Sequence, residues 1–223
     1  ISGLWSEIAA QQAQRYLEVE TVQAATQISL PEATFQYVHY VDNETVGGLE
    51  FSQQPWQGSA PVAVDMTSNL LTKKINVQEY GVIYAAAQKT LGVSGVTVVF
   101  VREDLLQDPH PWTPQILNYR LLAQENSLFN TPCLAAWLMM EKVLSWIQGQ
   151  GGVAVIESQV QQKSALLYDY LDSSDFYQNT VDRAWRSRTN VTFSLADTVL
   201  QSDFLSLAEQ HGLCYLKGHR YQG

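Results

Sequence analysis

The sequence is short of positive charge. It contains 13 lysine and arginine residues against 22 aspartate and glutamate residues, which gives a formal net charge of −9. A nucleic-acid-binding surface needs clustered basic side chains, so this composition argues against such a partner. Long apolar runs are also lacking. The nearest candidate, residues 134–147, is interrupted by Glu141 and Lys142, and we expect no membrane-spanning helix.

Cysteine and histidine are scarce as well. The two cysteines, Cys133 and Cys214, lie far apart and have neither metal-ligand nor redox spacing. We therefore expect two buried thiols in a reducing compartment, in preference to a disulfide. The four histidines are scattered, and no metal site is predicted. The first residues lack the basic region and apolar core of a signal peptide, and we expect a cytoplasmic protein and a chain that is a piece of something longer.

The pattern of apolar residues predicts an α/β fold. Strand-like apolar runs and helical patterns alternate along the chain, the former at residues 35–41, 60–68, 80–89 and 92–101 and the latter at 6–16 and 133–148. Buried strands separated by crossovers are typical of a mostly parallel sheet flanked by helices. Ser6 and Thr131 are expected to cap the two helices, and the second helix is expected to be mostly buried.

A glycine-rich break at residues 149–152 indicates a domain boundary. Residues 1–152 are expected to form a large domain, in which Lys73 and Lys74 are interpreted as a solvated surface pair. Residues 153–223 are expected to form a smaller C-terminal α/β domain. Its predicted elements are helices at 155–171 and 198–211 and strands at 190–194 and 213–216.

Polar residues follow three of the predicted strands: the loop from Asn43, then Asp65, then Lys89. In α/β sheets, ligands bind beyond the carboxyl ends of the strands. A lysine and a carboxylate at that place suit pyridoxal phosphate (PLP), because the amine forms a Schiff base and the carboxylate keeps the ring nitrogen protonated. Trp5 offers a face for the ring, and the helix start near Thr131 offers a phosphate site. Each residue taken alone is more often structural, and a lone Lys89 is more often a surface lysine.

A series of sequence blocks resembles the phosphoserine aminotransferase family. The family's cofactor-lysine region is matched by Tyr80-Gly-Val-Ile-Tyr, Ala87-Gln88-Lys89 and Val96–Val101 with Arg102-Glu-Asp-Leu-Leu106. Further blocks follow in family order and cover essentially the whole chain: His39-Tyr40 with Asn43-Glu44-Thr45, Val64-Asp65-Met-Thr-Ser68, Phe129-Asn130-Thr131-Pro132, Ser174-Asp175-Phe176-Tyr177, Arg186-Ser-Arg-Thr-Asn190-Val and Leu216-Lys-Gly-His219-Arg220. The resemblance implies a class V, fold-type I, PLP-dependent aminotransferase that forms a homodimer.

The resemblance also implies roles for individual residues. Lys89 matches the Schiff-base lysine and Asp65 the partner of the pyridine nitrogen. Trp5 matches the tryptophan that stacks on the cofactor ring, and Thr45 a threonine that contacts the cofactor. The remaining matched residues contact phosphate groups in the family: Thr67 and Gln88 on the cofactor, Asn130 and Thr131 on the cofactor of the neighbouring subunit, and His219 and Arg220 on the substrate.

The implied reaction is transamination between phosphoserine with 2-oxoglutarate and 3-phosphohydroxypyruvate with glutamate, in serine biosynthesis. The phosphohydroxythreonine step of vitamin B6 synthesis stays open as a second use. The family's N-terminal His-Arg segment and C-terminal Gly-Met-Arg block have no counterpart here, and the connection between Tyr16 and His39 is shorter. Two alternatives therefore remain: a non-catalytic fragment or homologue that keeps the dimerising core, and another class V enzyme such as an alanine–glyoxylate-type aminotransferase or a cysteine desulfurase.

Overall fold

The computed structural model describes residues 1–23, 35–56 and 58–219. Two compact units divide the chain, and the chain enters each of them more than once. The sheet unit comprises residues 26–42 and 54–157, and the hairpin unit comprises residues 1–25, 43–53 and 158–223. The sequence-based division at residues 152 and 153 stays a prediction.

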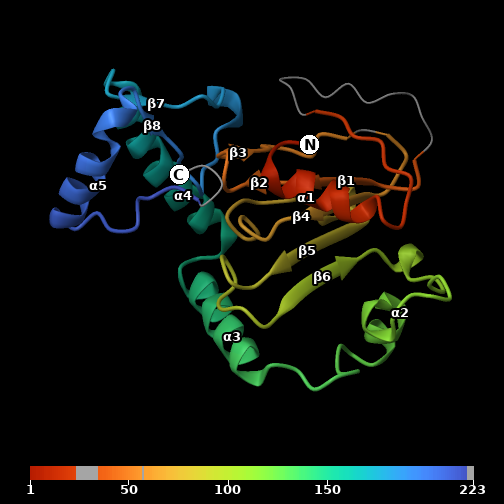
Figure 1. Cartoon of the computed structure of the whole chain (residues 1–223). Coiled ribbons are helices and arrows are strands. Elements are labelled where there is room, and N and C mark those ends of the chain that lie inside the picture. The colour runs from red at the N-terminus through yellow and green to blue at the C-terminus, as the bar shows by residue number, and fades with distance from the viewer. Residues whose placement is uncertain (24–34, 57, 220–223) are drawn as a thin grey trace. The chain divides into compact units, whose positions relative to one another are not determined.

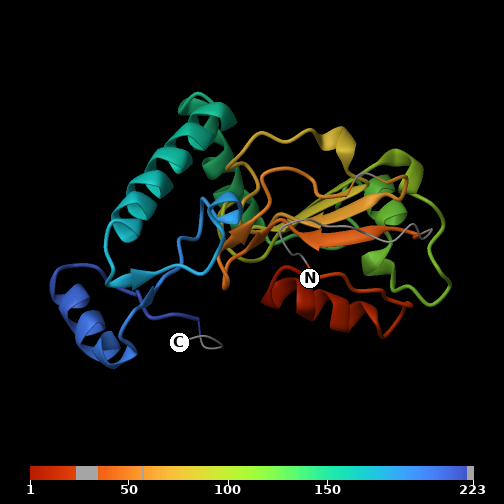
Figure 2. The same cartoon turned by 90° about the horizontal axis from the view of Figure 1, so that it is seen from above.

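A four-stranded sheet forms the centre of the sheet unit (Figures 1 and 2). Its strand order is β1 (Val38–Val41), β4 (Val62–Asp65), β5 (Val82–Ala86) and β6 (Thr97–Val101). The first three strands are parallel, and β6 runs antiparallel to β5. The antiparallel pairing follows from the connection, because the short turn after β5 is not long enough for a crossover. The predicted α/β fold with a mostly parallel sheet is confirmed.

One face of this sheet carries the apolar core. Its buried side chains alternate along the strands and come from Val62, Val64, Met66, Ile83 and Ala85. Alternate residues of a strand point to opposite faces, so the residues between them lie on the second, half-buried face. Each fully buried aliphatic side chain stabilises the fold by about 1.5–3 kcal/mol relative to an exposed one. The second face is the one that carries Asp65 and Tyr84.

The other elements of the sheet unit are short, apart from one helix. They are the helices α2 (Tyr119–Gln124) and α3 (Leu134–Gly149) and the 3₁₀ turns Val77–Glu79, Glu103–Leu105 and Gln115–Leu117. Helix α4 (Val153–Asp172) begins in the sheet unit and continues into the hairpin unit, and it confirms the helix predicted at residues 155–171.

Helix α3 differs from its prediction in two ways. It starts at Leu134 with Cys133 as the N-cap, so Thr131 does not cap it. Only Ala136 and Ile147 are buried, whereas Leu134 and Leu138 are each 64% exposed. The helix is apolar on nearly all sides, and a single chain covers only part of such a surface. The prediction of a mostly buried helix is therefore wrong for one chain.

The hairpin unit consists of short elements. They are α1 (Leu4–Ala13), β2 (Asn43–Glu44), β3 (Leu49–Glu50), β7 (Tyr177–Gln178), β8 (Ser194–Leu195), α5 (Gln201–Gln210) and the 3₁₀ turns Arg183–Trp185 and Thr198–Leu200. Strands β2 and β3 pair in one antiparallel hairpin, and β7 and β8 pair in another. An aromatic cluster of Phe176, Tyr177, Phe193 and Phe204 packs between β7, β8 and α5.

Several predictions for this unit need correction. Helix α1 begins earlier than predicted, with Gly3 and not Ser6 as its N-cap. Of the strand predicted at residues 190–194, only Ser194 lies in β8. Residues 213–216 form no strand: their side chains are exposed, and they pair with no strand in the part of the chain that the structure describes.

Among the described residues, no helix is both long enough and apolar enough to cross a membrane. Cys133 and Cys214 are both free and both exposed, so the predicted burial of the thiols is wrong.

Candidate active site

The carboxyl ends of β1, β4 and β5 lie at one edge of the sheet, because these strands are parallel and neighbouring. Asp65 is the last residue of β4, and it pairs in register with Val41 of β1 and Tyr84 of β5. Lys89 lies in the turn that directly follows β5. The structure thus brings Asp65 and Lys89 to the ends of adjacent parallel strands, as the sequence predicted.

Thr67 holds the end of β4 in place. Its main-chain N–H donates to Asp65 Oδ1 at 2.8 Å, and its Oγ1 accepts from the main-chain N–H of Ala86 at 3.2 Å. The first bond fixes the carboxylate, and the second ties the ends of β4 and β5 together. A half-buried carboxylate held in this way is pre-oriented toward a ligand, and no side-chain motion is needed to aim it.

His39 and Tyr84 accompany Asp65 on the half-buried face. His39 Nε2 lies 2.9 Å from the Tyr84 hydroxyl, and the two rings stack with centroids 6.0 Å apart. Burial lowers the pKa of His39, and the charge of Asp65 partly opposes that shift. Burial also raises the pKa of Tyr84, and Asp65 raises it further. Tyr84 was not predicted as a site residue from the sequence, and its closeness to Asp65 follows from the register of β4 and β5.

Gln88 and Lys89 are exposed in the turn after β5. The turn is closed by a hydrogen bond from the Ala87 main-chain N–H to the Val96 carbonyl oxygen at 2.9 Å. Ala87 and Leu91, on either side of the lysine, are buried and anchor the turn. Lys89 is thus an exposed residue on an anchored turn, and exposure suits a Schiff-base lysine, which a carbonyl compound must reach.

In the hairpin unit, three predicted site residues lie together. The indole N–H of Trp5 donates to Thr45 Oγ1 at 3.0 Å. The ring of His219 meets the Trp5 ring edge-on, with centroids 6.2 Å apart. Trp5 is 37% exposed, so part of its ring surface is open to a ligand. Arg220, predicted to act with His219, lies outside the described residues.

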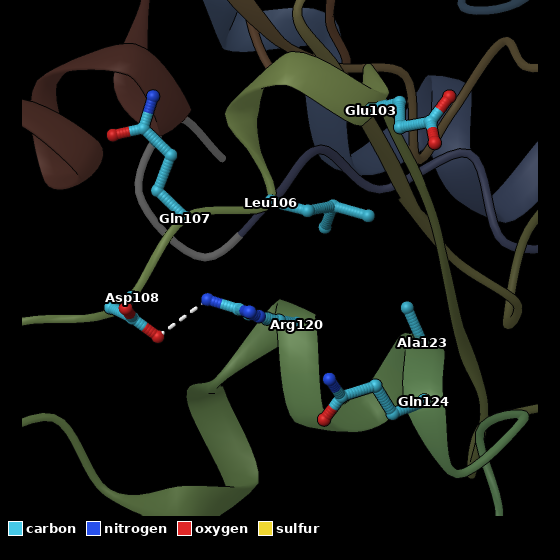
Figure 3. Close-up of a pocket in the computed structure, with 7 residues that line it drawn as sticks. All are labelled: Glu103, Leu106, Gln107, Asp108, Arg120, Ala123 and Gln124. Carbon is cyan, nitrogen blue, oxygen red and sulfur yellow. Dashed lines mark hydrogen bonds and ion pairs between the residues drawn. The ribbon is translucent and has the colours of Figure 1, made fainter.

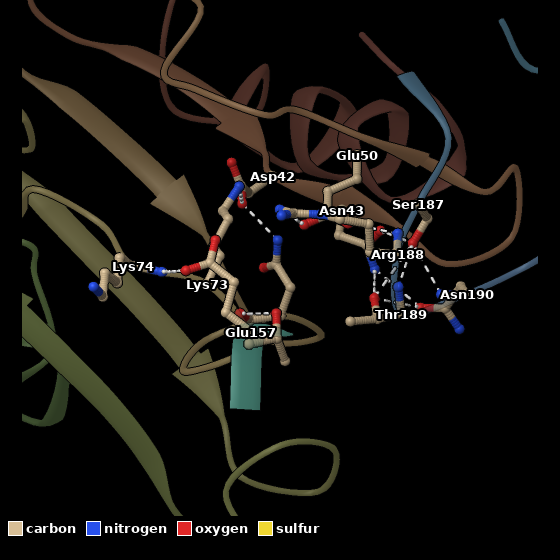
Figure 4. A network of polar contacts seen from close by, with 12 residues as sticks. Asp42, Asn43, Glu50, Lys73, Lys74, Glu157, Ser187, Arg188, Thr189 and Asn190 are labelled. Carbon is tan, nitrogen blue, oxygen red and sulfur yellow. Dashed lines mark hydrogen bonds and ion pairs between the residues drawn. The ribbon is translucent and has the colours of Figure 1, made fainter. Parts of the chain in front are cut away.

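Asn43 connects the hairpin to the segment at residues 187–190 of the same unit (Figure 4). Its amide donates to Thr189 Oγ1 and to Asn190 Oδ1, each at 3.0 Å, and accepts from the Ser187 hydroxyl. From the next strand, Glu50 accepts from the main-chain N–H of Arg188 at 2.8 Å and from its guanidinium at 2.9 Å. The loop predicted after β1 is therefore a hairpin with buried polar side chains.

The sheet unit has a buried ion pair that the sequence reading missed (Figure 4). Lys73 Nζ lies 2.6 Å from Asp42 Oδ2, with the lysine side chain 5% exposed and the aspartate 0% exposed. Asn69 donates to the same oxygen at 2.6 Å. Lys73 is thus not a solvated surface lysine, whereas the neighbouring Lys74 is exposed.

Asn130 and Thr131 are exposed and precede α3. Because the helix starts only at Leu134, neither side chain caps it. The phosphate site expected at this helix start stays a prediction. The predicted contact of both residues with a second subunit stays a prediction.

A hollow in the sheet unit lies away from all of these residues (Figure 3). Its volume is about 650 Å³, and Asp108 and Arg120 form an ion pair at its wall at 2.6 Å. Its remaining lining residues are Glu103, Leu106, Gln107, Ala123 and Gln124. Since none of the predicted site residues lines it, this hollow is separate from the candidate active site.

The residues of the sheet edge fit the chemistry of PLP. Asp65 supplies a fixed carboxylate for a protonated ring nitrogen, and Lys89 supplies a primary amine just beyond the adjacent strand. Thr67 and Gln88 add polar groups near those two residues in the chain. Within the hairpin unit, the Trp5–Thr45 pair presents an indole whose orientation is already fixed by a hydrogen bond.

Comparison with known proteins identifies related sequences. The family model described as aminotransferase class-V matches residues 5–222. A phosphoserine aminotransferase of Shewanella frigidimarina is 40% identical over 240 residues, which cover 100% of this chain and 65% of that protein. The chain therefore spans less than two thirds of the length of this relative.

Solved structures agree with the sequence comparison. Phosphoserine aminotransferase from Bacillus circulans subsp. alkalophilus superposes with a TM-score of 0.91 at 37% identity, over 100% of this chain and 65% of that one. A PLP-bound phosphoserine aminotransferase from Trichomonas vaginalis gives a TM-score of 0.87 at 29% identity, over 98% and 66%. Both likenesses extend over both units of the chain.

Proposed function

Because the chain belongs to the class-V aminotransferase family, we propose that it acts as a PLP-dependent phosphoserine aminotransferase. The reaction moves the amino group of phosphoserine to 2-oxoglutarate and gives 3-phosphohydroxypyruvate and glutamate. The observation that carries the proposal is the placement of Asp65 and Lys89 at the ends of adjacent parallel strands. The names of the relatives that align over the whole chain support the choice of substrate.

In the sheet unit, Lys89 bonds the cofactor and Asp65 binds its ring nitrogen. When bound, PLP supplies a conjugated ring that accepts the electron pair left on the substrate α-carbon after proton removal. The Nζ of Lys89 would hold the aldehyde carbon of PLP and, when free, would serve as the base that moves the proton of the substrate α-carbon. Asp65 keeps the ring nitrogen protonated throughout. Thr67 and Gln88 bind on the phosphate side.

In the hairpin unit, Trp5 stacks on the cofactor ring and Thr45 contacts it. His219 and Arg220 bind the phosphate group of the substrate, for which the planar guanidinium fork is well suited. The hydrogen bond between Trp5 and Thr45 supports this assignment, since it holds the indole in one orientation.

We further propose a homodimer in which Asn130 and Thr131 contact the cofactor phosphate of the neighbouring subunit. The exposed apolar side chains of α3, among them Leu134 and Leu138, support the association, because a second chain would cover them. A cytoplasmic location follows from the proposed role in serine biosynthesis and stays a prediction.

The test is spectroscopic. The purified chain is mixed with PLP, the visible absorption spectrum is recorded, and phosphoserine is then added. We expect a visible band from a lysine-bound cofactor that shifts when phosphoserine is added. The band should disappear in Lys89→Ala and persist in Lys74→Ala, which removes another exposed lysine of the same unit.

The possible results separate the alternatives. Absence of the band in the unaltered chain contradicts cofactor binding by this chain. A band that phosphoserine does not move favours a cofactor-binding core without transamination. A band that moves with alanine but not with phosphoserine favours another class V aminotransferase.

A further inference from the structure

Glu44 is a buried carboxylate at the start of helix α1. Its side chain is 0% exposed. Oε1 accepts from the main-chain N–H of Ser6 at 2.8 Å, and Oε2 accepts from the main-chain N–H of Trp5 at 3.0 Å. The first N–H groups of a helix lack partners within the helix, and a carboxylate there also gains from the helix dipole. Glu44 thus fixes the main chain of Trp5.

The next residue fixes the side chain of the same tryptophan. Thr45 Oγ1 accepts from the indole N–H of Trp5 at 3.0 Å. Glu44 and Thr45 are consecutive, so one dipeptide at the end of β2 holds both the main chain and the ring of Trp5. Two attachment points restrict both the position of the helix start and the rotation of the indole.

The dipeptide is itself held firmly. Asn43, directly before it, makes two hydrogen bonds of 3.0 Å to residues 189 and 190. Gly3 allows α1 to approach closely, because a Cβ atom at this position would lie 2.9 Å from Glu44 Cδ. Glu44 and the start of α1 are therefore packed closely, and neither can shift without a steric clash or the loss of a hydrogen bond.

We propose that Glu44 is a positioning residue that fixes the Trp5 indole in the orientation needed to stack on the cofactor ring. The inference rests on the proposed function, in which Trp5 is the stacking residue. Glu44 does not touch the cofactor in this account, and its effect passes through Trp5 alone. A residue that only stabilises the fold would instead affect cofactor binding whether or not Trp5 is present.

Glu44→Gln is the first variant. An amide has one carbonyl oxygen, and its NH₂ group would face one of the two N–H donors, so the variant loses one acceptor and the charge. Glu50→Gln is the matched control. Glu50 is also a buried glutamate of this hairpin and also accepts from a main-chain N–H, but its partner is Arg188 and not α1.

Gly3→Ala is a second variant that keeps the carboxylate. The added methyl group would push the carboxylate away from the helix start. It should reproduce the effect of Glu44→Gln in weaker form. If Glu44→Gln fails to fold, Gly3→Ala still tests the proposal.

The orientation of Trp5 is measured without cofactor. The chain has six tryptophans, and each is replaced by 5-fluorotryptophan for fluorine NMR, with Trp5→Phe identifying the line of Trp5. We expect this line to shift or broaden in Glu44→Gln and in Gly3→Ala. It should keep its position in Glu50→Gln.

The link to the cofactor is measured by a double-mutant cycle. PLP is titrated into the unaltered chain, Glu44→Gln, Trp5→Ala and the double variant, and the dissociation constant is taken from the visible band. Loss of a charged hydrogen bond that orients the ring is expected to weaken binding by about tenfold. Because Glu44 acts through the indole of Trp5, the double variant should bind no more weakly than Trp5→Ala.

Two results would overturn the inference. One is an unchanged Trp5 line in both Glu44→Gln and Gly3→Ala. The other is a double variant in which the two losses multiply, since Glu44 would then act independently of Trp5. If the unaltered chain does not bind PLP, the proposed function fails for this chain, and the fluorine spectra still decide whether Glu44 orients the indole.

Discussion

The two units position their candidate site residues by different means. In the sheet unit, Asp65 ends one regular strand and Lys89 follows the next, and the buried face of these strands is apolar. In the hairpin unit, Trp5 and Thr45 depend on two-residue strands and on the buried polar side chains around them. One unit aims its residues through the geometry of a parallel sheet, and the other through individual hydrogen bonds.

This difference predicts how much stability each unit loses when a buried side chain is substituted. An apolar core accepts another apolar residue of similar volume with a small loss of stability. A buried hydrogen-bonded group has no such substitute, because removal of one partner leaves the other buried and unsatisfied. We therefore expect the hairpin to be more specific in the side chains it requires.

The largest effect is expected at a buried ion pair in the sheet unit. Lys73→Met leaves Asp42 buried without its cation, and we expect a loss of about 3–5 kcal/mol in the free energy of unfolding. Urea-induced unfolding measures it. Lys74→Met, at the exposed neighbouring position, should change stability by less than about 0.5 kcal/mol. Equal effects of the two variants would show that the ion pair is not maintained in solution.

A smaller effect is expected in the hairpin. Asn43→Ala removes a buried amide that bonds to three side chains, and we expect a loss of about 1–3 kcal/mol. The same unfolding experiment applies. Asn76→Ala removes an exposed side chain that caps a single 3₁₀ turn, and its effect should stay below about 1 kcal/mol. If Asn43→Ala were as mild as Asn76→Ala, the hairpin would not depend on its polar contacts.

The smallest effect concerns pH. Burial lowers the pKa of His39 below its usual 6.5. At pH values between the lowered pKa of the folded chain and the usual pKa of the unfolded chain, His39 is protonated only in the unfolded chain. The free energy of unfolding therefore falls as the pH falls, by at most about 1.4 kcal/mol per pH unit. His39→Gln should reduce this slope, whereas His211→Gln, at an exposed site, should not. An unchanged slope in His39→Gln would contradict burial of the neutral imidazole.

The same contrast explains what could be predicted from the sequence. The strands β4 and β5 and the strand-end positions of Asp65 and Lys89 were predicted, because β-branched runs and the parallel-sheet rule are local patterns. The hairpin after β1 was read as a loop, since two-residue strands leave no periodic signal. Burial of Lys73 and Glu44 depends on partners distant in the sequence, which no local pattern reveals.

For helix α3, burial was predicted from the sequence but is not found in the single chain. Its apolar composition predicted burial, yet Leu134 and Leu138 are exposed in the single chain. Apolar composition indicates that a surface is covered, and it does not say whether the cover comes from the same chain or from a second one. The strand predicted at residues 213–216 failed because a short apolar run does not by itself supply a neighbouring strand.

The central claim is that Lys89, at the edge of the sheet, is the covalent anchor of the cofactor. The most direct measurement is to load the chain with PLP, reduce it with borohydride, digest it and locate the modified lysine by mass spectrometry. The account predicts one modified peptide, with the reduced cofactor attached to Lys89. Attachment to Lys74 or another lysine while Lys89 remains unmodified would contradict it.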